Sequence, residues 1–174
     1  GVHKINLGRC TGITREGLKA LAGVHTITLN KCKTLNDVNF GVLSGVHSIN
    51  LNDTKVRDED LESFSGVHKI SLYLCSQITD KGVKHLSGVH TIYLGGTSVT
   101  DEGLKSLAGV HSIYLYAMCR SNEITDDGIS ALAGVHTIFI LSLNLTDKGI
   151  AALSGVHTIT LGYLNVTNEG IAAL

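Results

Sequence analysis

The chain has 174 residues, of which 43% are hydrophobic and 17% are charged, with 20 Gly, no Pro and no Trp. Flexible glycine-rich chains are poor in Leu, Ile and Val, whereas this one is apolar enough to form a core of single-domain size. Its net charge of -1 offers no general attraction to nucleic acids or anionic membranes, so we expect neither as a partner. No signal peptide or membrane-spanning run is recognisable, and because the sequence does not begin with Met we expect a longer protein around it.

The tripeptide Gly-Val-His divides the sequence into eight units. In each unit the spacing Val-x-x-Ile-x-Leu predicts a short strand with one buried face. A segment of the type Thr-Asp-x-Gly-Leu follows and predicts a short helix, with Thr as its N-cap and Asp favoured by the helix dipole. The Gly of the next tripeptide comes where the helix ends, and a positive φ is expected there. The units begin at residues 1, 23, 45, 66, 88, 109, 134 and 155, and the strands are predicted over 2–7, 24–29, 46–51, 67–72, 89–94, 110–115, 135–140 and 156–161.

A strand and a helix in about 22 residues cannot bury their apolar faces alone, so the units must stack on one another. Residues 67–82, Val-His-Lys-Ile-Ser-Leu-Tyr-Leu-Cys-Ser-Gln-Ile-Thr-Asp-Lys-Gly, resemble the cysteine-containing leucine-rich repeat of F-box/leucine-rich-repeat proteins. The resemblance implies an α/β fold, a single right-handed solenoid domain over 1–174 with parallel strands on the concave face and short helices on the convex face. It also implies a role in substrate recognition within an F-box-like ubiquitin-ligase receptor. The sequence departs from that family in lacking an F-box and in carrying Gly-Val-His before each strand.

The cysteines follow the repeat. Cys10, Cys32 and Cys75 share a column that holds Thr or Leu in other units, which indicates buried thiols that pack as small hydrophobes. No C-x-x-C pair is present, so no zinc site is expected, and unpaired thiols favour a reducing, intracellular compartment. Cys119 lies in an insertion over 117–123 and is expected to be exposed. Secretion remains the alternative, because the sequence contains glycosylation sequons at Asn52, Asn144 and Asn165.

Eight of the nine His occupy one column, directly before the strands. Successive strands lie about 4.8 Å apart, so the imidazoles are expected to form a stacked row. Identical side chains in a straight row do not converge on a metal ion, and we predict a structural ladder in which each neutral imidazole bonds a neighbouring unit. Protonation would set like charges side by side, which predicts a loss of stability between pH 7 and pH 5. His85 is expected on a helix surface, and the ladder consists of His3, His25, His47, His68, His90, His111, His136 and His157.

The aromatic residues are few but concentrated. Phe40 and Phe64 replace core Leu in the helical segments, whereas every Tyr lies on or beside the outward face of the strands. Exposed aromatic side chains are typical of interaction hot spots, and the insertion in the sixth unit lies next to them. The alternative is that cross-strand aromatic pairs only stabilise the sheet. The partner-binding residues predicted in this way are Tyr73, Tyr93, Tyr114, Tyr116, Phe139, Leu141 and Tyr163.

No motif for catalysis or for a cofactor stands out from the repeat. Gly95-Gly96 is not followed by the Lys-Ser/Thr of a phosphate-binding loop, and no nucleophile and base occur together outside the repeat columns. The leading hypothesis is therefore a non-enzymatic scaffold that binds a protein on its concave face, without cofactor or metal. The alternative is a structural solenoid that self-associates head to tail into filaments through uncapped repeat ends.

Overall fold

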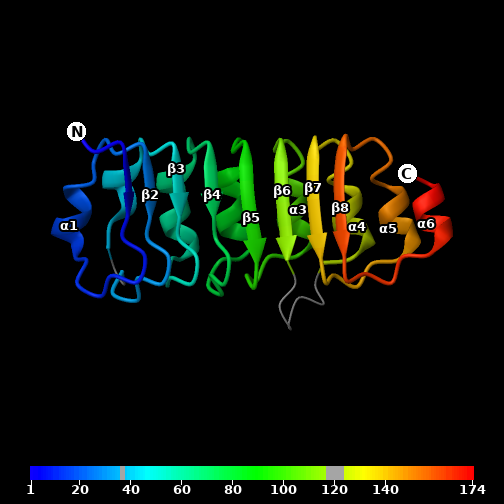
Figure 1. Ribbon diagram of the computed structural model, residues 1–174, viewed down its shortest axis with the longest axis horizontal. Helices are drawn as coiled ribbons and strands as arrows, with labels where there is room; N and C mark the ends of the chain where they lie inside the picture. The colour runs from blue at the N-terminus through cyan, green and yellow to red at the C-terminus, as the bar shows by residue number, and fades with distance from the viewer. Residues whose placement is uncertain (36–37, 117–123) are drawn as a thin grey trace.

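A computed structural model describes residues 1–35, 38–116 and 124–174 of the chain. Eight parallel strands form one sheet in which strand order follows sequence order (Figure 1). The sheet is open and its strands stand side by side. The strands are β1 (Lys4–Asn6), β2 (Thr26–Thr28), β3 (Ser48–Asn50), β4 (Lys69–Ser71), β5 (Thr91–Gly95), β6 (Ser112–Tyr116), β7 (Thr137–Leu141) and β8 (Thr158–Gly162).

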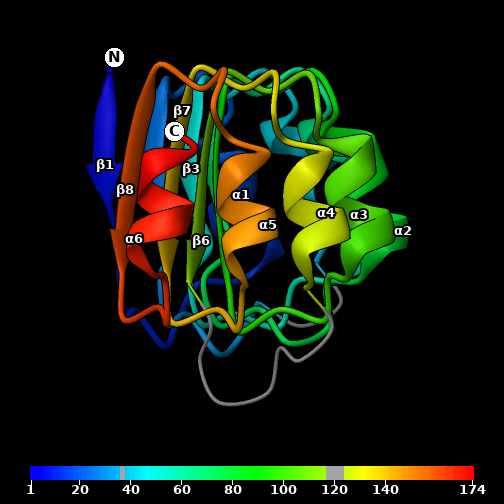
Figure 2. The same ribbon diagram turned by 90° about the vertical axis from the view of Figure 1, so that its right-hand side faces the viewer.

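The helical segments all cover one face of the sheet and leave the other face open (Figure 2). This two-layer arrangement confirms the predicted α/β solenoid, and we call the uncovered side the open sheet face. The α-helices are α1 (Arg15–Lys19), α2 (Asp80–Val83), α3 (Asp101–Ser106), α4 (Asp126–Ser130), α5 (Asp147–Ala151) and α6 (Asn168–Ala172). The 3₁₀ helices are η1 (Phe40–Leu43), η2 (Asp58–Phe64) and η3 (Lys84–Leu86).

Parallel pairing places equivalent residues of successive units side by side. The central Ile of each strand pairs with the Ile of the next, as Ile49 does with Ile70 and Ile70 with Ile92. These side chains and the helical Leu and Ile residues form one continuous core, and burying each of them contributes about 1.5–3 kcal/mol. Phe40 and Phe64 are buried in that core with their ring centroids 5.7 Å apart, as the sequence predicted.

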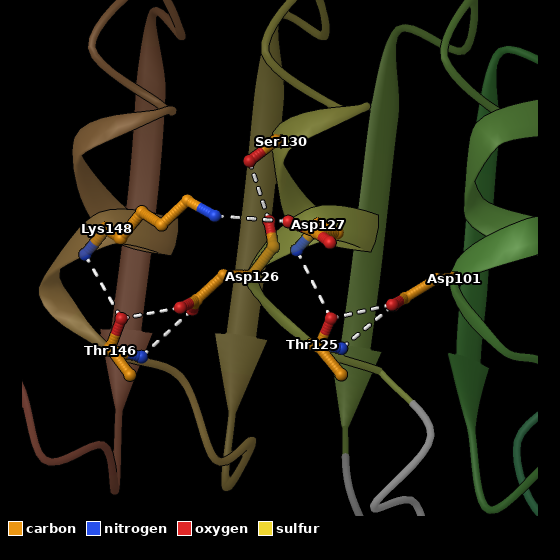
Figure 3. Close-up of polar contacts among 7 residues, drawn as sticks. All are labelled: Asp101, Thr125, Asp126, Asp127, Ser130, Thr146 and Lys148. Atoms are coloured by element: carbon orange, nitrogen blue, oxygen red, sulfur yellow. Dashed lines mark hydrogen bonds and ion pairs between the residues drawn. The ribbon is translucent and has the colours of Figure 1, made fainter.

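A second row of contacts joins the helical sides of the units (Figure 3). The Thr125 backbone N–H and hydroxyl donate to the two carboxylate oxygens of Asp101 in the preceding unit, at 2.8 and 2.7 Å. The same Thr hydroxyl accepts a hydrogen bond from the backbone N–H of Asp127 at 3.2 Å and so caps its own helix. The predicted Thr N-caps are confirmed for α2 to α6, whereas the Thr14 side chain makes no capping hydrogen bond to α1. The Asp side chains bond the next unit, a role beyond the expected interaction with the helix dipole. Equivalent pairs are Asp58–Thr79, Asp80–Thr100, Asp126–Thr146 and Asp147–Thr167.

The glycine of Thr-Asp-x-Gly makes these contacts possible. A Cβ added at Gly128 would overlap the Asp101 carboxylate and come within 3.0 Å of the Asp101 Cα. The third unit carries Asp60 at this position and Arg57 in place of the capping Thr, and it forms the 3₁₀ helix η2. There the Asp60 carboxylate accepts from the Arg57 backbone N–H at 2.8 Å instead.

The glycines of Gly-Val-His behave differently from the prediction. Among those that the structure describes, only Gly23 has a positive φ, of 79°, so the expectation was wrong for the others. The helical segment ends with short i to i+3 hydrogen bonds, such as Val46 N–H to the Leu43 carbonyl at 2.9 Å, which need no left-handed residue. The left-handed conformation instead recurs in the turn after the strand, at Arg9, Lys31, Asp53, Leu74, Gly96, Ser142 and Tyr163.

These two kinds of glycine predict opposite effects of the same substitution. Gly128→Ala should lower the free energy of unfolding by about 1–3 kcal/mol, because the new methyl group displaces the Asp101 link. Gly88→Ala is the matched control: its Cβ would meet nothing within 4 Å, and we expect a stability equal to or up to about 1 kcal/mol above the wild type. Urea titration measures both, and equal destabilisation by the two variants would contradict this account.

Candidate functional site

The register of the sheet gathers aromatic side chains from neighbouring strands on the open sheet face. Tyr93 of β5 pairs with Tyr114 of β6, which in turn pairs with Phe139 of β7. The Tyr93 and Tyr114 rings stack with centroids 4.1 Å apart and planes at 11°, and Phe139 follows Tyr114 at 5.7 Å. Such pairs contribute about 0.5–1.5 kcal/mol each beyond the area they bury.

A second aromatic pair forms across a strand that has no side chain at the relevant position. Tyr73 beyond β4 and Tyr116 of β6 meet edge to face, with centroids 5.7 Å apart, although β5 lies between them. Gly95 of β5 leaves the space: a Cβ there would come within 3.0 Å of Tyr73 Cδ2 and Tyr116 Cβ, and within 2.6 Å of the Tyr116 carbonyl oxygen. The sequence excluded Gly95-Gly96 as a phosphate-binding loop and placed Gly95 in an outward-facing column, but it did not reveal this role.

Together the five rings line a groove of about 400 Å³, which we call the aromatic groove. Asn52 and Ser71 line it with polar groups, and buried Leu94 and Leu115 also contribute. The Asn52 side-chain oxygen accepts from the Ser71 hydroxyl at 2.6 Å and from the Tyr73 backbone N–H at 2.9 Å, which orients its amide. The groove therefore offers a mainly apolar surface with one positioned amide.

Two phenols of this groove, those of Tyr73 and Tyr114, stay neutral at physiological pH. Burial, followed by the proximity of Tyr93, raises the pKa of Tyr114 above its usual value, and burial, followed by Tyr116, raises that of Tyr73. Neutral rings can pack apolar groups and exchange hydrogen bonds without a charge to neutralise.

The structure brings together five of the seven residues predicted as a partner site: Tyr73, Tyr93, Tyr114, Tyr116 and Phe139. Leu141 lies outside the groove lining and packs toward Gly162 of β8, where an added Cβ would overlap it. Tyr163 is 86% exposed and lines a separate hollow with Leu164 and Val166, because it occupies the turn after β8 with φ 55° and not a strand position. The predicted insertion and Cys119 lie outside the described residues.

A polar groove of about 390 Å³ adjoins the aromatic one over β1 to β5. It shares Asn52, Ser71 and Tyr93 with the aromatic groove and adds two cations, Lys4 and Lys69. The Lys69 ammonium lies 4.9 Å from the centroid of the Tyr93 ring, a cation–π distance, and so stands at the junction of the two grooves. The lysines could have been found in the sequence by reading the column before each central Ile.

The eight predicted histidines form a continuous stack along the edge where the strands begin. Successive ring centroids lie 4.2–4.5 Å apart with planes at 11–25°. The expected hydrogen bond to a neighbouring unit is wrong in its detail: Nδ1 of His90 bonds the Thr91 hydroxyl of its own unit at 3.0 Å, and His111 does the same with Ser112. The neighbour is contacted by stacking, and the backbone carbonyl of every ladder histidine except His157, in the last unit, accepts one or two N–H groups from the next unit, as that of His68 does from His90 and Thr91.

Free thiols and sequons occupy ordinary structural positions. The Cys75 thiol is buried and donates to the Leu51 carbonyl of the preceding unit at 3.1 Å, and burial raises its pKa. Cys32 is also buried, and its thiol donates to the Leu7 carbonyl at 3.1 Å, as a packing column requires. Of the sequon residues, Asn144 and Asn165 are exposed, whereas Asn52 lies half-buried in the groove.

Two further properties concern metals and membranes. In residues 1–35, 38–116 and 124–174, no three His, Cys, Asp or Glu side chains lie where they could jointly hold a metal ion. None of the helices described here has the length and apolar character that crossing a bilayer requires.

Comparisons with known proteins agree with this architecture. A family model described as Leucine Rich repeat matches residues 2–22 and 120–133. The repeat, the parallel sheet and the helical layer together form a leucine-rich-repeat fold (Figure 2). No curated protein matches the sequence.

Solved structures match the fold at low sequence identity. An internalin (inlF) from Listeria monocytogenes is similar over 99% of this chain and 58% of its own, with a TM-score of 0.65 and 18% identity. A chain of a TLR13–ssRNA13 complex is similar over 92% of this chain and 25% of its own, with a TM-score of 0.66 and 15% identity. The protein thus spans less than two thirds of either structure, and the likeness concerns the fold alone.

The histidine stack predicts a pH-dependent stability. Burial, and then the charges of the neighbouring histidines, lower the pKa of His25 and of His136 below the usual value near 6.5. The unfolded chain then binds more protons than the folded one as pH falls below about 6.5, so folding stability decreases in that direction. We expect the Tm to fall by several degrees from pH 7 to pH 5, where unfolded carboxylates are still mostly ionised.

A pair of variants separates the stack from other titrating groups. His90→Asn with His111→Asn interrupts the stack and should reduce the pH dependence of the Tm, whereas His85→Asn, at an exposed position of η3, should leave it unchanged. A wild-type Tm that is the same at pH 7 and pH 5 would contradict the prediction.

Proposed function

We propose that this protein is a non-enzymatic module that binds a partner protein on its open sheet face, with the aromatic groove as the centre of the interface. The observation that supports it is the unfilled groove between the Tyr93–Tyr114 stack and the Tyr73–Tyr116 pair. Aromatic side chains bring a large contact area at a low cost in conformational entropy, and they dominate interface hot spots.

Binding by rigid strands also limits the entropic cost of association. Tyr93, Tyr114 and Phe139 lie on paired strands and are half-buried, so their rotamers are restricted before any partner binds. Preorganised side chains lose less freedom on binding than mobile ones do. Leucine-rich-repeat proteins are typical protein-binding scaffolds, which agrees with this role.

The resemblance to cysteine-containing repeats extends the proposal to substrate recognition for a ubiquitin ligase. Its support is the thiol column, in which Cys32 and Cys75 bond carbonyls of the preceding unit. The specific test is whether a captured partner is ubiquitylated in cells and whether substitution of the groove abolishes that modification.

The central prediction concerns the stacked pair. Tyr93→Ala with Tyr114→Ala should weaken partner binding at least about thirtyfold, since hot-spot residues contribute 2 kcal/mol or more. Stability should fall by only about 1–2 kcal/mol, because the pair is partly exposed. Partners captured by crosslinking to the wild-type protein would be identified, purified and titrated against both forms by calorimetry.

Thr160→Ala provides the matched control. Thr160 occupies the same row on β8, next to Phe139, but is exposed and does not line the groove. We expect it to keep wild-type affinity. Unchanged affinity in the Tyr93/Tyr114 variant, or binding of a single-stranded RNA oligonucleotide that depends on these tyrosines, would contradict a protein-binding groove.

Head-to-tail self-association into filaments is the alternative to the binding module. The molecular mass in solution distinguishes the two. Val2, Ile171 and Leu174, in the first and last units, are 61%, 54% and 42% exposed, and apolar contacts between copies would cover them. Light scattering over a wide concentration range should give growing polymers if the chain is a filament subunit. A constant monomer mass would exclude that alternative and leave the binding module.

A further inference from the structure

The charged residues of the open sheet face are all positive. Three outward-facing residue columns cover it: the residue before each central Ile, the residue after that Ile, and the residue that follows the strand Leu. Among the 24 residues of these columns there is no Asp or Glu, although the chain contains 15 acidic residues. The only charged residues there are Lys4 and Lys69.

Neither lysine is neutralised within the part of the chain that the structure describes. The ion pairs found there join Lys19, Lys33, Arg57, Lys105 and Lys148 to carboxylates on helices and turns. Lys69 instead extends its ammonium over the Tyr93 ring at 4.9 Å. A cation–π contact orients the ammonium but leaves its charge, so a carboxylate from another molecule can still pair with it.

We infer that the segment bound on this face is an extended stretch of a partner protein that presents a carboxylate to Lys69 and an aromatic or aliphatic side chain to the aromatic groove. This inference rests on the proposed function and specifies its ligand. Charge complementarity supports the acidic group, and the ring-lined groove supports the apolar one. An extended conformation suits the surface, because both grooves run across consecutive strands of an open sheet.

Sheet spacing sets the distance between the two groups in the ligand. Strands lie about 4.8 Å apart and an extended chain rises about 3.3 Å per residue, so one strand step corresponds to roughly one and a half ligand residues. The distance from Lys69 on β4 to Phe139 on β7 is three strand steps, which an extended ligand spans with about four residues. The apolar side chain is therefore expected within about four residues of the acidic one, and a second acidic residue about four residues to the other side would reach Lys4 on β1.

A polyanion such as RNA fits this face less well. Two lysines that lie three strand steps apart neutralise few phosphates, and affinity for nucleic acid scales with the number of phosphate contacts. A single carboxylate beside an apolar side chain matches one ammonium beside an aromatic groove.

The test is a selection of displayed random peptides of about twelve residues, long enough when extended to cross the whole sheet. The selected pool should be enriched in Asp or Glu within about four residues of an aromatic or aliphatic residue. A synthetic selected peptide, titrated by fluorescence anisotropy, should bind Lys69→Met about three- to tenfold more weakly. Met keeps the apolar stem and removes only the charge. Lys84→Met, on η3 of the helical layer, is the matched control and should bind as the wild type does.

Swapping the charges of Lys69 and of the peptide tests whether Lys69 acts through its charge or only through its effect on the structure. The Lys69→Glu variant should prefer the peptide in which Lys replaces the acidic residue, and added salt should weaken wild-type binding more than that of Lys69→Met. Peptides that depend on Tyr93 and Tyr114 but show no acidic enrichment, or that bind Lys69→Met equally well, would overturn the inference and leave the proposed function intact. Selected peptides whose binding survives Tyr93→Ala with Tyr114→Ala would overturn the proposed function as well.

Discussion

Parallel pairing of equivalent residues in successive units controls the position of nearly every side chain. A unit of about 22 residues buries its apolar residues only against its neighbours, so the units must meet in one register. The Asp101 carboxylate reaches both donors of Thr125 only in this register, and Gly128 must lack a side chain for the units to approach so closely. Repeated along the chain, these contacts join the helical layer while the sheet joins the strands.

Because equivalent residues lie side by side, a change of residue type at one outward-facing position of the repeat changes the open sheet face locally. Where Asn50 and Ser71 are succeeded by Tyr93 and Tyr114, the open sheet face changes from polar to aromatic within one strand spacing. Gly95 then allows rings from β4 and β6 to meet across β5. The core recurs along the chain and the Asp–Thr links recur from the third unit onward, so the face that varies is the one suited to select a partner.

Ionisable residues that recur at the same position of successive units also affect one another's protonation. The stacked imidazoles gain contact with their neighbours while they are neutral, but burial in the stack, followed by the charges of His47 and His3, lowers the pKa of His25. On the helical side, hydrogen bonds from the Thr167 hydroxyl and N–H lower the pKa of Asp147 and so favour its charged form. The neutral form is favoured at His25 and the charged form at Asp147, so the two groups respond to acid in different pH ranges.

Periodicity alone determined the number of units, the strands, the buried residues, the Thr caps and the row of histidines, because each depends on contacts that recur at the same position in every unit. Five aromatic residues of the candidate site were also predictable, since they lie in strand columns whose direction alternates regularly. Only the tertiary structure decided that Gly95 makes room for Tyr73 and Tyr116, that Lys69 lies over Tyr93, that Tyr163 lies apart from the groove, and that the left-handed residues follow the strands. These features depend on distances between different columns of neighbouring units, and a repeat pattern specifies the columns but not the space between them.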